Sequence, residues 1–486
     1  MSTLQDLNQV LSRKQEILEN AAGVEKQKKS GKLTARERVD LLLDEGSFLE
    51  QSMLLSDAGV VTGSGTVEGR PVYVAAQDFA VMDGAVGAKQ AKKIVKILDL
   101  ARKTGTPVVL MCDSNGARVG EGAAALEAYT DIFAHMARLS GVVPMITMVL
   151  GPCVGAAAMV AELSDLVVVA KEGALLVAGP QVISATMGKD VKTAVELGGA
   201  KIAVENGTAQ FACETEEEAF AQVKTLLGIL PANNLEDAPF SVEEDMNRAV
   251  TGLAAGADGI EVITKLADTG SVVEAGKGYT GAVTAFAKMA GRTVAFVYTG
   301  KGDTCDKRME KIARFVRFAD CYNIPVVSLI DSTGLEIFKS ADRQMNVIKA
   351  ASKLVYAYSE ATTVKVSLVI GNAIGAAYVA MGGSANADAT YAWPGAVISP
   401  LTGEAAIAIW NKEEINNSTG DAVAARKELA AKYESEVADG VCAAVNGLVD
   451  DVIDPADTRK MVIAALEMLS SKRDSNPPKK HGNMPL

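Results

Sequence analysis

The stretch Gly151-Pro-Cys-Val-Gly-Ala-Ala-Ala-Met-Val160 follows directly on an apolar run, Val142-Val-Pro-Met-Ile-Thr-Met-Val-Leu150. The run has the length of a strand and is rich in β-branched residues, so it predicts a buried strand. The small residues after it predict a tight turn that opens into a helix. Such a turn leaves backbone N–H groups unpaired at the start of the helix and lets a ligand approach them closely.

The same design occurs a second time, far downstream. There the apolar run Val364-Lys-Val-Ser-Leu-Val-Ile370 leads into Gly371-Asn-Ala-Ile-Gly-Ala-Ala-Tyr-Val-Ala-Met381. We call residues 151–160 the first elbow and residues 371–381 the second elbow. One such turn is weak evidence for a site, but two at matching places in one chain are much stronger.

Other segments repeat in the same order as the elbows. Gly46-Ser-Phe-Leu-Glu50 is echoed by Gly270-Ser-Val-Val-Glu274, the segment 92–109 by 310–327, and Asp113-Ser by Asp331-Ser. Each half is predicted to contain a hairpin, a helix, a strand, an Asp-Ser loop, a helix, a strand and an elbow. This order indicates the duplication of a whole domain, and the alternation of strand and helix places both copies in the α/β class.

The domain boundary is predicted in a polar segment bounded by prolines, Pro231-Ala-Asn-Asn-Leu-Glu-Asp-Ala-Pro239. A chain of 486 residues is too long for one ordinary domain. We therefore expect one domain over residues 1–235, with an N-terminal helix over 1–31, and a second over 236–486. Thr34 and Glu37 fit a capping box at the start of the next helix.

The composition restricts the kinds of partner that we expect. A formal net charge of −12 argues against a nucleic-acid partner, which requires a basic face. The N-terminus has no signal-peptide pattern. The apolar segment 142–161 contains Pro144, Gly151 and Pro152 and has no basic flank, so we reject it as a membrane span. We expect a cytoplasmic location, either free or peripheral to a membrane complex, with scattered reduced cysteines.

The sequence argues against catalysis by histidine, because the chain has only His135 and His481. A two-histidine metal site would need both, so we predict no metal. His135 lies in a helical pattern without a partner at a suggestive spacing, which favours a structural role over a catalytic triad. The chain has no Gly-x-x-x-x-Gly-Lys-Ser/Thr loop for ATP.

The elbows have two interpretations. Fixed backbone N–H groups at a helix start can stabilise an oxyanion, and small residues leave room for the ligand. Close packing of helix on strand also favours Gly and Ala. For one elbow these alternatives are about even, and the duplication favours two oxyanion sites, although duplication would also copy a packing feature.

Motifs over nearly the full length resemble a known family, the carboxyltransferase subunits of biotin-dependent acyl-CoA carboxylases and decarboxylases (the propionyl-CoA carboxylase β and methylmalonyl-CoA decarboxylase α family). The resemblance implies two duplicated crotonase-like (ClpP/crotonase) ββα-superhelix domains. The motifs are Gly31-Lys-Leu-Thr-Ala-Arg-Glu-Arg-Val-Asp-Leu-Leu-Leu43, Gln77-Asp-Phe79, Ala91-Lys-Lys-Ile-Val-Lys96, Gly151-Pro-Cys153, Glu196-Leu-Gly-Gly-Ala200, Asn233-Asn-Leu-Glu-Asp237, Ala392-Trp-Pro394 and Lys479-Lys-His-Gly-Asn-Met-Pro-Leu486.

The resemblance implies a carboxyl transfer between biotin and a short acyl-CoA, either propionyl/methylmalonyl-CoA or acetyl/malonyl-CoA. Two oxyanions form, the thioester enolate and the biotin ureido oxygen, and no side-chain base is needed. Gly155 and Ala156 would supply the catalytic amides for one oxyanion, and Ala376 and Ala377 those for the other. The N-terminal domain would bind acyl-CoA and the C-terminal domain of a partner subunit would bind biotin.

The resemblance also implies further contacts. Gly116, Ala117 and Val379 would contact acyl-CoA, and Gly334 and Gly375 would contact biotin. Lys89, Lys92, Lys93 and Lys96 form one helix stripe that suits a CoA phosphate, but a solvated face is the favoured alternative. The sequence departs from the family pattern at Asn115, at Ala203, at 331–335 and at Ala376.

The expected partners follow from the same resemblance. The chain has no Met-Lys-Met-type attachment site, so biotin must arrive on a separate biotin carboxyl carrier protein. A biotin carboxylase or a membrane decarboxylase subunit would complete the complex, and the chain would form a homo-oligomer, a dimer or a trimer of dimers. Two alternatives stay open: a crotonase-type acyl-CoA hydrolase or isomerase that does not use biotin, and a non-catalytic scaffold subunit.

Overall fold

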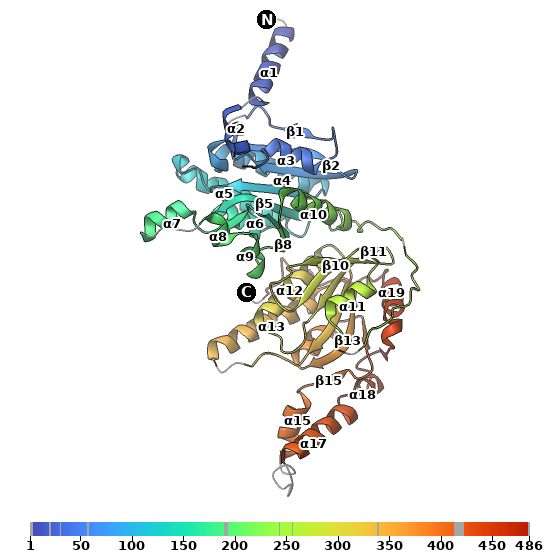
Figure 1. Ribbon diagram of the computed structural model, residues 1–486. Helices are drawn as coiled ribbons and strands as arrows, with labels where there is room; N and C mark the ends of the chain where they lie inside the picture. The colour runs from blue at the N-terminus through green and yellow to red at the C-terminus, as the bar shows by residue number, and fades with distance from the viewer. Residues whose placement is uncertain are drawn as a thin grey trace. The chain divides into compact units, whose positions relative to one another are not determined.

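The chain folds into two compact α/β units, Met1–Asp237 and Ala238–Leu486, which we call the N-terminal unit and the C-terminal unit. The computed structural model (Figure 1) describes residues 3–18, 21–29, 31–55, 58–188, 193–242, 244–254, 256–337, 340–412 and 422–484. Each unit is built around one sheet in which a short antiparallel part continues into parallel strands.

The sheet of the N-terminal unit has the strand order β1-β2-β3-β4-β5-β6-β8, and β7 pairs with the end of β5. The predicted hairpin is confirmed, because β2 and β3 pair antiparallel with Val67 opposite Arg70. From β3 onward the neighbouring strands are parallel. The strands are β1 (Leu49–Gln51), β2 (Val60–Val67), β3 (Arg70–Gln77), β4 (Val108–Ser114), β5 (Met145–Val154), β6 (Leu166–Ala170), β7 (Ala174–Leu176) and β8 (Phe211–Cys213).

Helices cover both faces of this sheet, since β4 is buried along its whole length. The predicted capping box is confirmed: the Thr34 hydroxyl accepts the Glu37 N–H, and the Glu37 carboxylate accepts the Thr34 N–H at 2.9 Å. The single helix expected over 1–31 is instead two, although residues 1–2, 19–20 and 30 lie outside the described part. The helices are α1 (Thr3–Leu18), α2 (Ala21–Lys29), α3 (Ala35–Leu42), α4 (Ala88–Thr104), α5 (Ala123–Leu139), α6 (Ala156–Glu162), α7 (Pro180–Met187), α8 (Ala194–Gly198), α9 (Ala200–Glu205) and α10 (Glu216–Ile229).

The C-terminal unit repeats this architecture. Its strand order is β16-β14-β13-β12-β11-β10-β9, and β15 pairs with the end of β13. The two sheets therefore share one topology, which confirms the predicted duplication. The strands are β9 (Val273–Ala275), β10 (Val283–Met289), β11 (Arg292–Tyr298), β12 (Val326–Ser332), β13 (Lys365–Ile374), β14 (Ala389–Ala392), β15 (Val397–Ser399) and β16 (Asp451–Val452).

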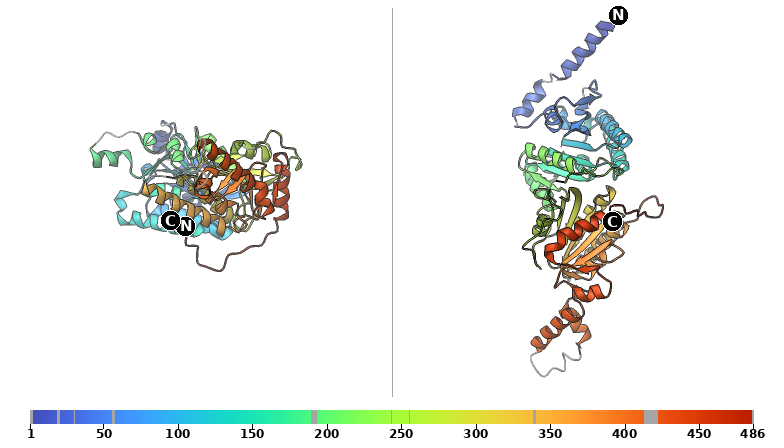
Figure 2. Two further views of the ribbon diagram at one scale, coloured as in Figure 1. Left: turned by 90° about the horizontal axis from the view of Figure 1, so that it is seen from below. Right: turned by 90° about the vertical axis from the view of Figure 1, so that its right-hand side faces the viewer.

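Several helices of the C-terminal unit pack on its sheet, whereas α15 and α17 lie side by side beyond the sheet (Figure 2). Within that pair the rings of Trp410 and Tyr433 are 6.0 Å apart. No helix in the described ranges has the length and apolar character to cross a membrane. The helices are α11 (Gly259–Leu266), α12 (Asp306–Cys321), α13 (Ala341–Glu360), α14 (Ala376–Met381), α15 (Gly403–Trp410), α17 (Ala422–Glu436), α18 (Gly440–Val445) and α19 (Thr458–Met468).

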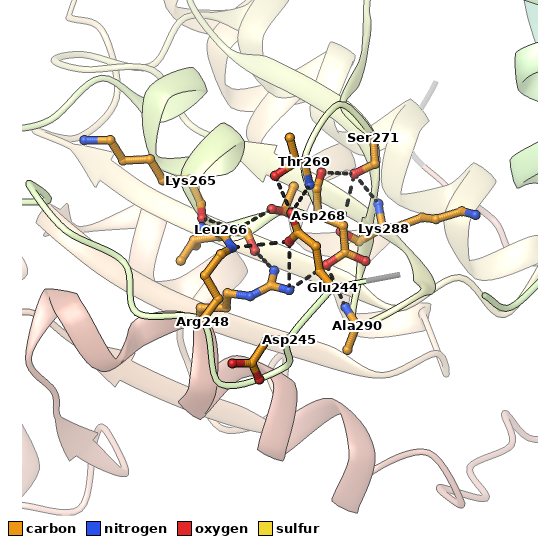
Figure 3. Close-up of polar contacts among 12 residues, drawn as sticks. Glu244, Asp245, Arg248, Lys265, Leu266, Asp268, Thr269, Ser271, Lys288 and Ala290 are labelled. Carbon is orange, nitrogen blue, oxygen red and sulfur yellow. Dashed lines mark hydrogen bonds and ion pairs between the residues drawn. The ribbon is translucent and has the colours of Figure 1, made fainter. Parts of the chain in front are cut away.

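A buried polar cluster fixes the beginning of the C-terminal unit to its body (Figure 3). The carboxylate of Asp268 accepts the N–H groups of Ala290 and Gly291 in the β10–β11 turn, and Arg459 of α19 donates to it at 2.6 Å. The Glu244 carboxylate accepts the Thr269 N–H at 3.1 Å. Because the Arg459 side chain is buried, these paired carboxylates supply the charge that it requires.

Candidate functional site

The first elbow turns at Gly155, which has φ 63° and ψ −122°. A side chain is disfavoured at this φ, so a glycine is needed here. The strand before it is longer than predicted: β5 continues to Val154 because its last residues pair with β7. The Gly155 N–H donates to the Leu176 carbonyl of β7 at 2.8 Å, so this predicted donor is already in use. Within the described residues, the N–H groups of Ala156 and Ala157 have no acceptor.

The second elbow has the same geometry. Gly375 has φ 57° and ψ −119°, and its N–H donates to the Ser399 carbonyl of β15 at 2.8 Å. In the part of the chain that the structure describes, the next two amides, of Ala376 and Ala377, lack a protein acceptor. These are the two residues that the sequence predicts as donors at this elbow.

A loop beside the first elbow presents one more unused amide. Gly116 has φ 98°, and its N–H donates to the Ser114 hydroxyl at 3.1 Å. On its other side the loop bonds to Val86, whose N–H donates to the Gly116 carbonyl and whose carbonyl accepts the Arg118 N–H. The Ala117 N–H between these bonds has no acceptor among the described residues.

The C-terminal unit repeats the loop as well. Gly334 has φ 120° and donates its N–H to the Ser332 hydroxyl at 3.2 Å. Thr304 takes the place of Val86. Its N–H donates to the Gly334 carbonyl, and its carbonyl accepts the Glu336 N–H. Leu335, the equivalent of Ala117, has an N–H without an acceptor in the described ranges.

Each loop lies against its elbow. A methyl group on Gly116 would lie 3.1 Å from the Val154 carbonyl oxygen, so the loop touches the end of β5. In the C-terminal unit one cavity is lined by both parts, namely Gly334 and Leu335 from the loop and Ala376 and Ala377 from the elbow. We call each arrangement of a loop amide and elbow amides an amide cradle. It can stabilise an oxyanion with fixed donors.

A buried carboxylate, that of Asp113, packs against Gly151 of the first elbow. Asp113 is fully buried at the end of β4 and is ion-paired with Arg38 at 2.9 Å and Lys32 at 3.0 Å. A methyl group on Gly151 would lie 2.0 Å from the Asp113 Oδ1 atom, so the elbow needs a glycine here as well. Because both of its oxygens are ion-paired in the interior, Asp113 has a structural role.

The prediction of one exposed lysine stripe on α4 is wrong for Lys93. Lys92 and Lys96 are exposed, but Lys93 is buried and its Nζ donates to the Val60 carbonyl at 2.6 Å. Burial lowers the pKa of Lys93 to about 8. Only the exposed lysines can therefore meet a phosphate. The predicted acyl-CoA contact Val379 is 59% exposed on α14, in the C-terminal unit.

Histidine and cysteine do not contribute to the cradles. His135 is on the surface of α5, where its Nδ1 lies 2.8 Å from the Asp131 carbonyl oxygen. No group of metal-ligating side chains occurs among the described residues. A hydrogen bond with Cys112 and burial raise the pKa of the Cys153 thiol well above its usual range. A thiol in this environment is a poor nucleophile.

Sequence reasoning missed Ala157, Leu335 and the serines that cap the two loops. The repeated Asp-Ser pairs at 113–114 and 331–332 were the available signal. Their second members accept the N–H groups of Gly116 and Gly334, and the next amide in each loop has no acceptor among the residues that the structure describes.

Comparison with known proteins gives one consistent result. The family model "Carboxyl transferase domain" matches residues 26–484. The chain is 39% identical to the methylmalonyl-CoA carboxyltransferase 12S subunit of Propionibacterium freudenreichii subsp. shermanii, over 100% of this chain and 98% of that protein. It is 37% identical to the methylmalonyl-CoA decarboxylase subunit alpha of Propionigenium modestum, over 98% of each.

The solved structures agree. The crystal structure of the transcarboxylase 12S hexamer, with hydrolysed methylmalonyl-coenzyme A bound, has a TM-score of 0.91 and 38% identity to this chain. The match covers 100% of this chain and 99% of that one. The predicted duplicated crotonase-like architecture is thereby confirmed, because the two chains share the fold along their whole length.

Proposed function

This chain belongs to the carboxyl transferase family, and from this premise we propose that it moves a carboxyl group between biotin and a short acyl-CoA. The observation that supports this most is the duplicated amide cradle. The reaction has two oxyanions to stabilise, and each unit of the chain offers one set of fixed N–H donors.

The cradle of the N-terminal unit would hold the thioester oxygen of the acyl-CoA. Its donors would be the amides of Ala117 and Ala156. The neighbouring Ala157 amide is a further possible donor. Gly155 contributes its backbone conformation and not its N–H, since that group bonds to Leu176. Removal of one oxyanion donor typically costs about 3 kcal/mol of barrier, a loss of 10²–10³ in rate.

The cradle of the C-terminal unit would hold the ureido oxygen of biotin. The amides of Leu335 and Ala376 match the N-terminal pair, with Ala377 beside them. The ureido group of biotin fits here, because its oxygen only accepts hydrogen bonds. The side chains that line the cavity around these amides are small or apolar. Biotin supplies the carried carboxyl group when bound, and the chain supplies orientation and charge stabilisation.

The proposed substrates are propionyl-CoA and methylmalonyl-CoA. The names of the two relatives above include methylmalonyl-CoA as the substrate. A transcarboxylase 12S structure contains the hydrolysed compound. Exposed lysines on α4, Lys92 among them, would meet the CoA phosphates. The backbone conformations of Gly116 and Gly334 would fix the two loops of the cradles. Val379 on α14 would contact the acyl group.

Other polypeptides complete the proposed enzyme. Biotin would arrive on a separate carrier protein, as the absence of an attachment motif in the sequence suggests. We propose a homo-oligomer in which the N-terminal unit of one copy faces the C-terminal unit of another, consistent with the hexamer of the transcarboxylase relative. The location would be cytoplasmic, alone or beside a membrane subunit.

A direct experiment is CO2 release from methylmalonyl-CoA and from malonyl-CoA, each with and without free biotin. The proposal requires release that depends on biotin, with methylmalonyl-CoA as the better substrate. Turnover of the thioester without biotin would instead support a crotonase-type hydrolase or isomerase. Binding of the CoA ester without any turnover would support a scaffold subunit.

A further inference from the structure

A groove between α4 and α5 lies at the far end of these helices from the first cradle. The loop of the cradle is bridged to Val86, just before α4 begins, whereas the groove is lined by residues from the later turns of both helices. The proposed carboxyl transfer makes no use of this place, which we call the α4–α5 groove. It forms a cavity of about 460 Å³, lined by Leu98, Asp99, Arg102, His135 and Arg138.

The α4–α5 groove is basic on a chain that is acidic overall. The carboxylate in its wall, that of Asp99, is already paired on α4 itself, with Arg102 at 2.9 Å and with Lys103 at 2.5 Å. The guanidinium of Arg138 has no hydrogen bond or ion pair with any residue that the structure describes. The groove therefore presents an uncompensated positive charge, although the net charge of the chain is −12.

The C-terminal unit has an equivalent groove between α12 and α13. The echo of residues 92–109 in 310–327 places Arg317 where α4 has Asp99. The buried residues of α5 recur on α13 with the same spacing, and this places Glu360 where α5 has Arg138. The two grooves thus carry opposite charges at the same two places. The matched buried residues are Ala125, Ala128, Ile132 and Met136 on α5 and Val347, Ala350, Leu354 and Tyr358 on α13.

The groove of the C-terminal unit holds the chain's own C-terminal tail. The Glu360 carboxylate accepts a hydrogen bond from the Lys479 ammonium, and the Glu360 carbonyl accepts one from the Asn476 side chain at 2.8 Å. A methyl group on Gly482 would collide with the Tyr356 hydroxyl, so the tail also runs close to α13 at that point. In one unit, therefore, the fold uses this groove to hold a segment of chain by its charge.

We propose that the α4–α5 groove binds an extended, acidic segment of a partner polypeptide. Arg138 pairs with a carboxylate of that segment, just as Glu360 pairs with Lys479 in the other unit, and an arginine can do so through two hydrogen bonds. Arg102 adds a second positive charge from α4. The tail of a second copy is not the occupant, because its Lys479-Lys-His481 would be repelled by the arginines.

Two other roles for the arginines are separable from the binding of a peptide. Arg102 and Arg138 lie in the last turns of their helices, where a cation stabilises the helix through its dipole. That role accounts for the charges but not for the open cavity between them. A site for a small anion such as phosphate would use the same charges, but the equivalent groove of the other unit holds a peptide segment.

The test measures the binding of two labelled peptides to the full chain by fluorescence anisotropy at low salt, where charge pairs are least screened. The first peptide is residues 475–484 with Lys479→Glu and Lys480→Glu, a charge-reversed copy of the tail, and the second keeps both lysines. The proteins are wild type and Arg138→Glu, which gives the groove the charge of the other unit. Arg426→Glu is the matched control, because it makes the same change of charge on the exposed surface of α17.

Wild type should bind the acidic peptide in a saturable manner, roughly tenfold more tightly than the lysine peptide, because the groove carries the opposite charge. Arg138→Glu should weaken the acidic peptide by roughly tenfold and strengthen the lysine peptide, so that the preference reverses. Arg426→Glu should leave both affinities within about twofold of wild type.

The proposal is overturned if wild type shows no saturable binding of the acidic peptide, or if Arg138→Glu does not reverse the preference. Displacement of the acidic peptide by an equal concentration of sodium phosphate would show a site for small anions instead. A changed sedimentation coefficient for Arg138→Glu, without peptide binding to wild type, would show a contact between copies of the chain. Because no turnover is measured, these outcomes do not depend on the proposed carboxyl transfer.

Discussion

The amide of Gly155 donates to the carbonyl of Leu176 at 2.8 Å, a bond that ties the first elbow to β7. The second elbow has the same bond between Gly375 and Ser399. A glycine N–H that holds the turn in place cannot also bind a ligand. In the proposed function the ligand would therefore bind the amides that follow, and the glycine would serve through its backbone conformation.

Gly151→Ala should destabilise the N-terminal unit by about 3 kcal/mol, because the new methyl group would meet both the Asp113 carboxylate and the Lys32 ammonium. Thermal unfolding measures the effect. Gly120→Ala is the matched control: a methyl group there has nothing within 4 Å, and Gly120 does not have a positive φ. Equal melting temperatures for the two variants would contradict this account of the elbow.

Arg38→Met should cost about 3–5 kcal/mol, because it leaves Asp113 and Glu216 without their buried cation. Arg102→Met, which breaks an exposed ion pair with Asp99, should cost at most about 1 kcal/mol. Denaturant unfolding of both variants is the measurement. A small loss for Arg38→Met would show that Lys32 alone compensates Asp113.

The C-terminal tail should respond to acid through Glu360. Burial works to raise the pKa of this carboxyl, but hydrogen bonds from Lys479 and Arg317 prevail and lower it to about 2. A carboxyl with a lowered folded pKa stabilises the fold above its unfolded pKa, and this stabilisation is lost as the pH falls through the folded value.

Wild type should therefore lose stability between about pH 4.5 and pH 2, and Glu360→Gln should lose less over the same interval. Unfolding in urea at a series of pH values measures both slopes. Parallel slopes for the two proteins would contradict the role given to Glu360.

Much of the fold follows from local sequence patterns. The capping box at Thr34, the hairpin around Gly69 and the repeated order of elements are set by neighbours along the chain, so patterns of a few residues predict them. The end of β5 was predicted too early because Gly151 and Pro152 suggest a turn. Pairing with β7 keeps them in the sheet.

The details of the site depend on contacts between distant segments. The bond between Gly155 and Leu176 has no signal in either local sequence. Lys93 has the spacing of an exposed stripe, but the edge of its helix packs on β2, where its ammonium meets the Val60 carbonyl. The resemblance predicts amide donors at both elbows, and only the hydrogen bonds reveal that the N–H groups of Gly155 and Gly375 already have acceptors.

The central claim, two amide cradles serving one reaction, is tested most directly by Ala156→Pro and Ala376→Pro. Each residue is the first of its helix, where proline fits the backbone, so the change removes one N–H with little effect on the fold. Ala156→Gly and Ala376→Gly are the matched controls, because they keep the N–H.

The measurement is the kcat of biotin-dependent carboxyl transfer from methylmalonyl-CoA, with circular dichroism to verify folding. The account predicts a loss of roughly 10²–10³ for each proline variant and a change of only a few fold for each glycine variant. A folded proline variant at either elbow that retains the wild-type kcat would contradict it.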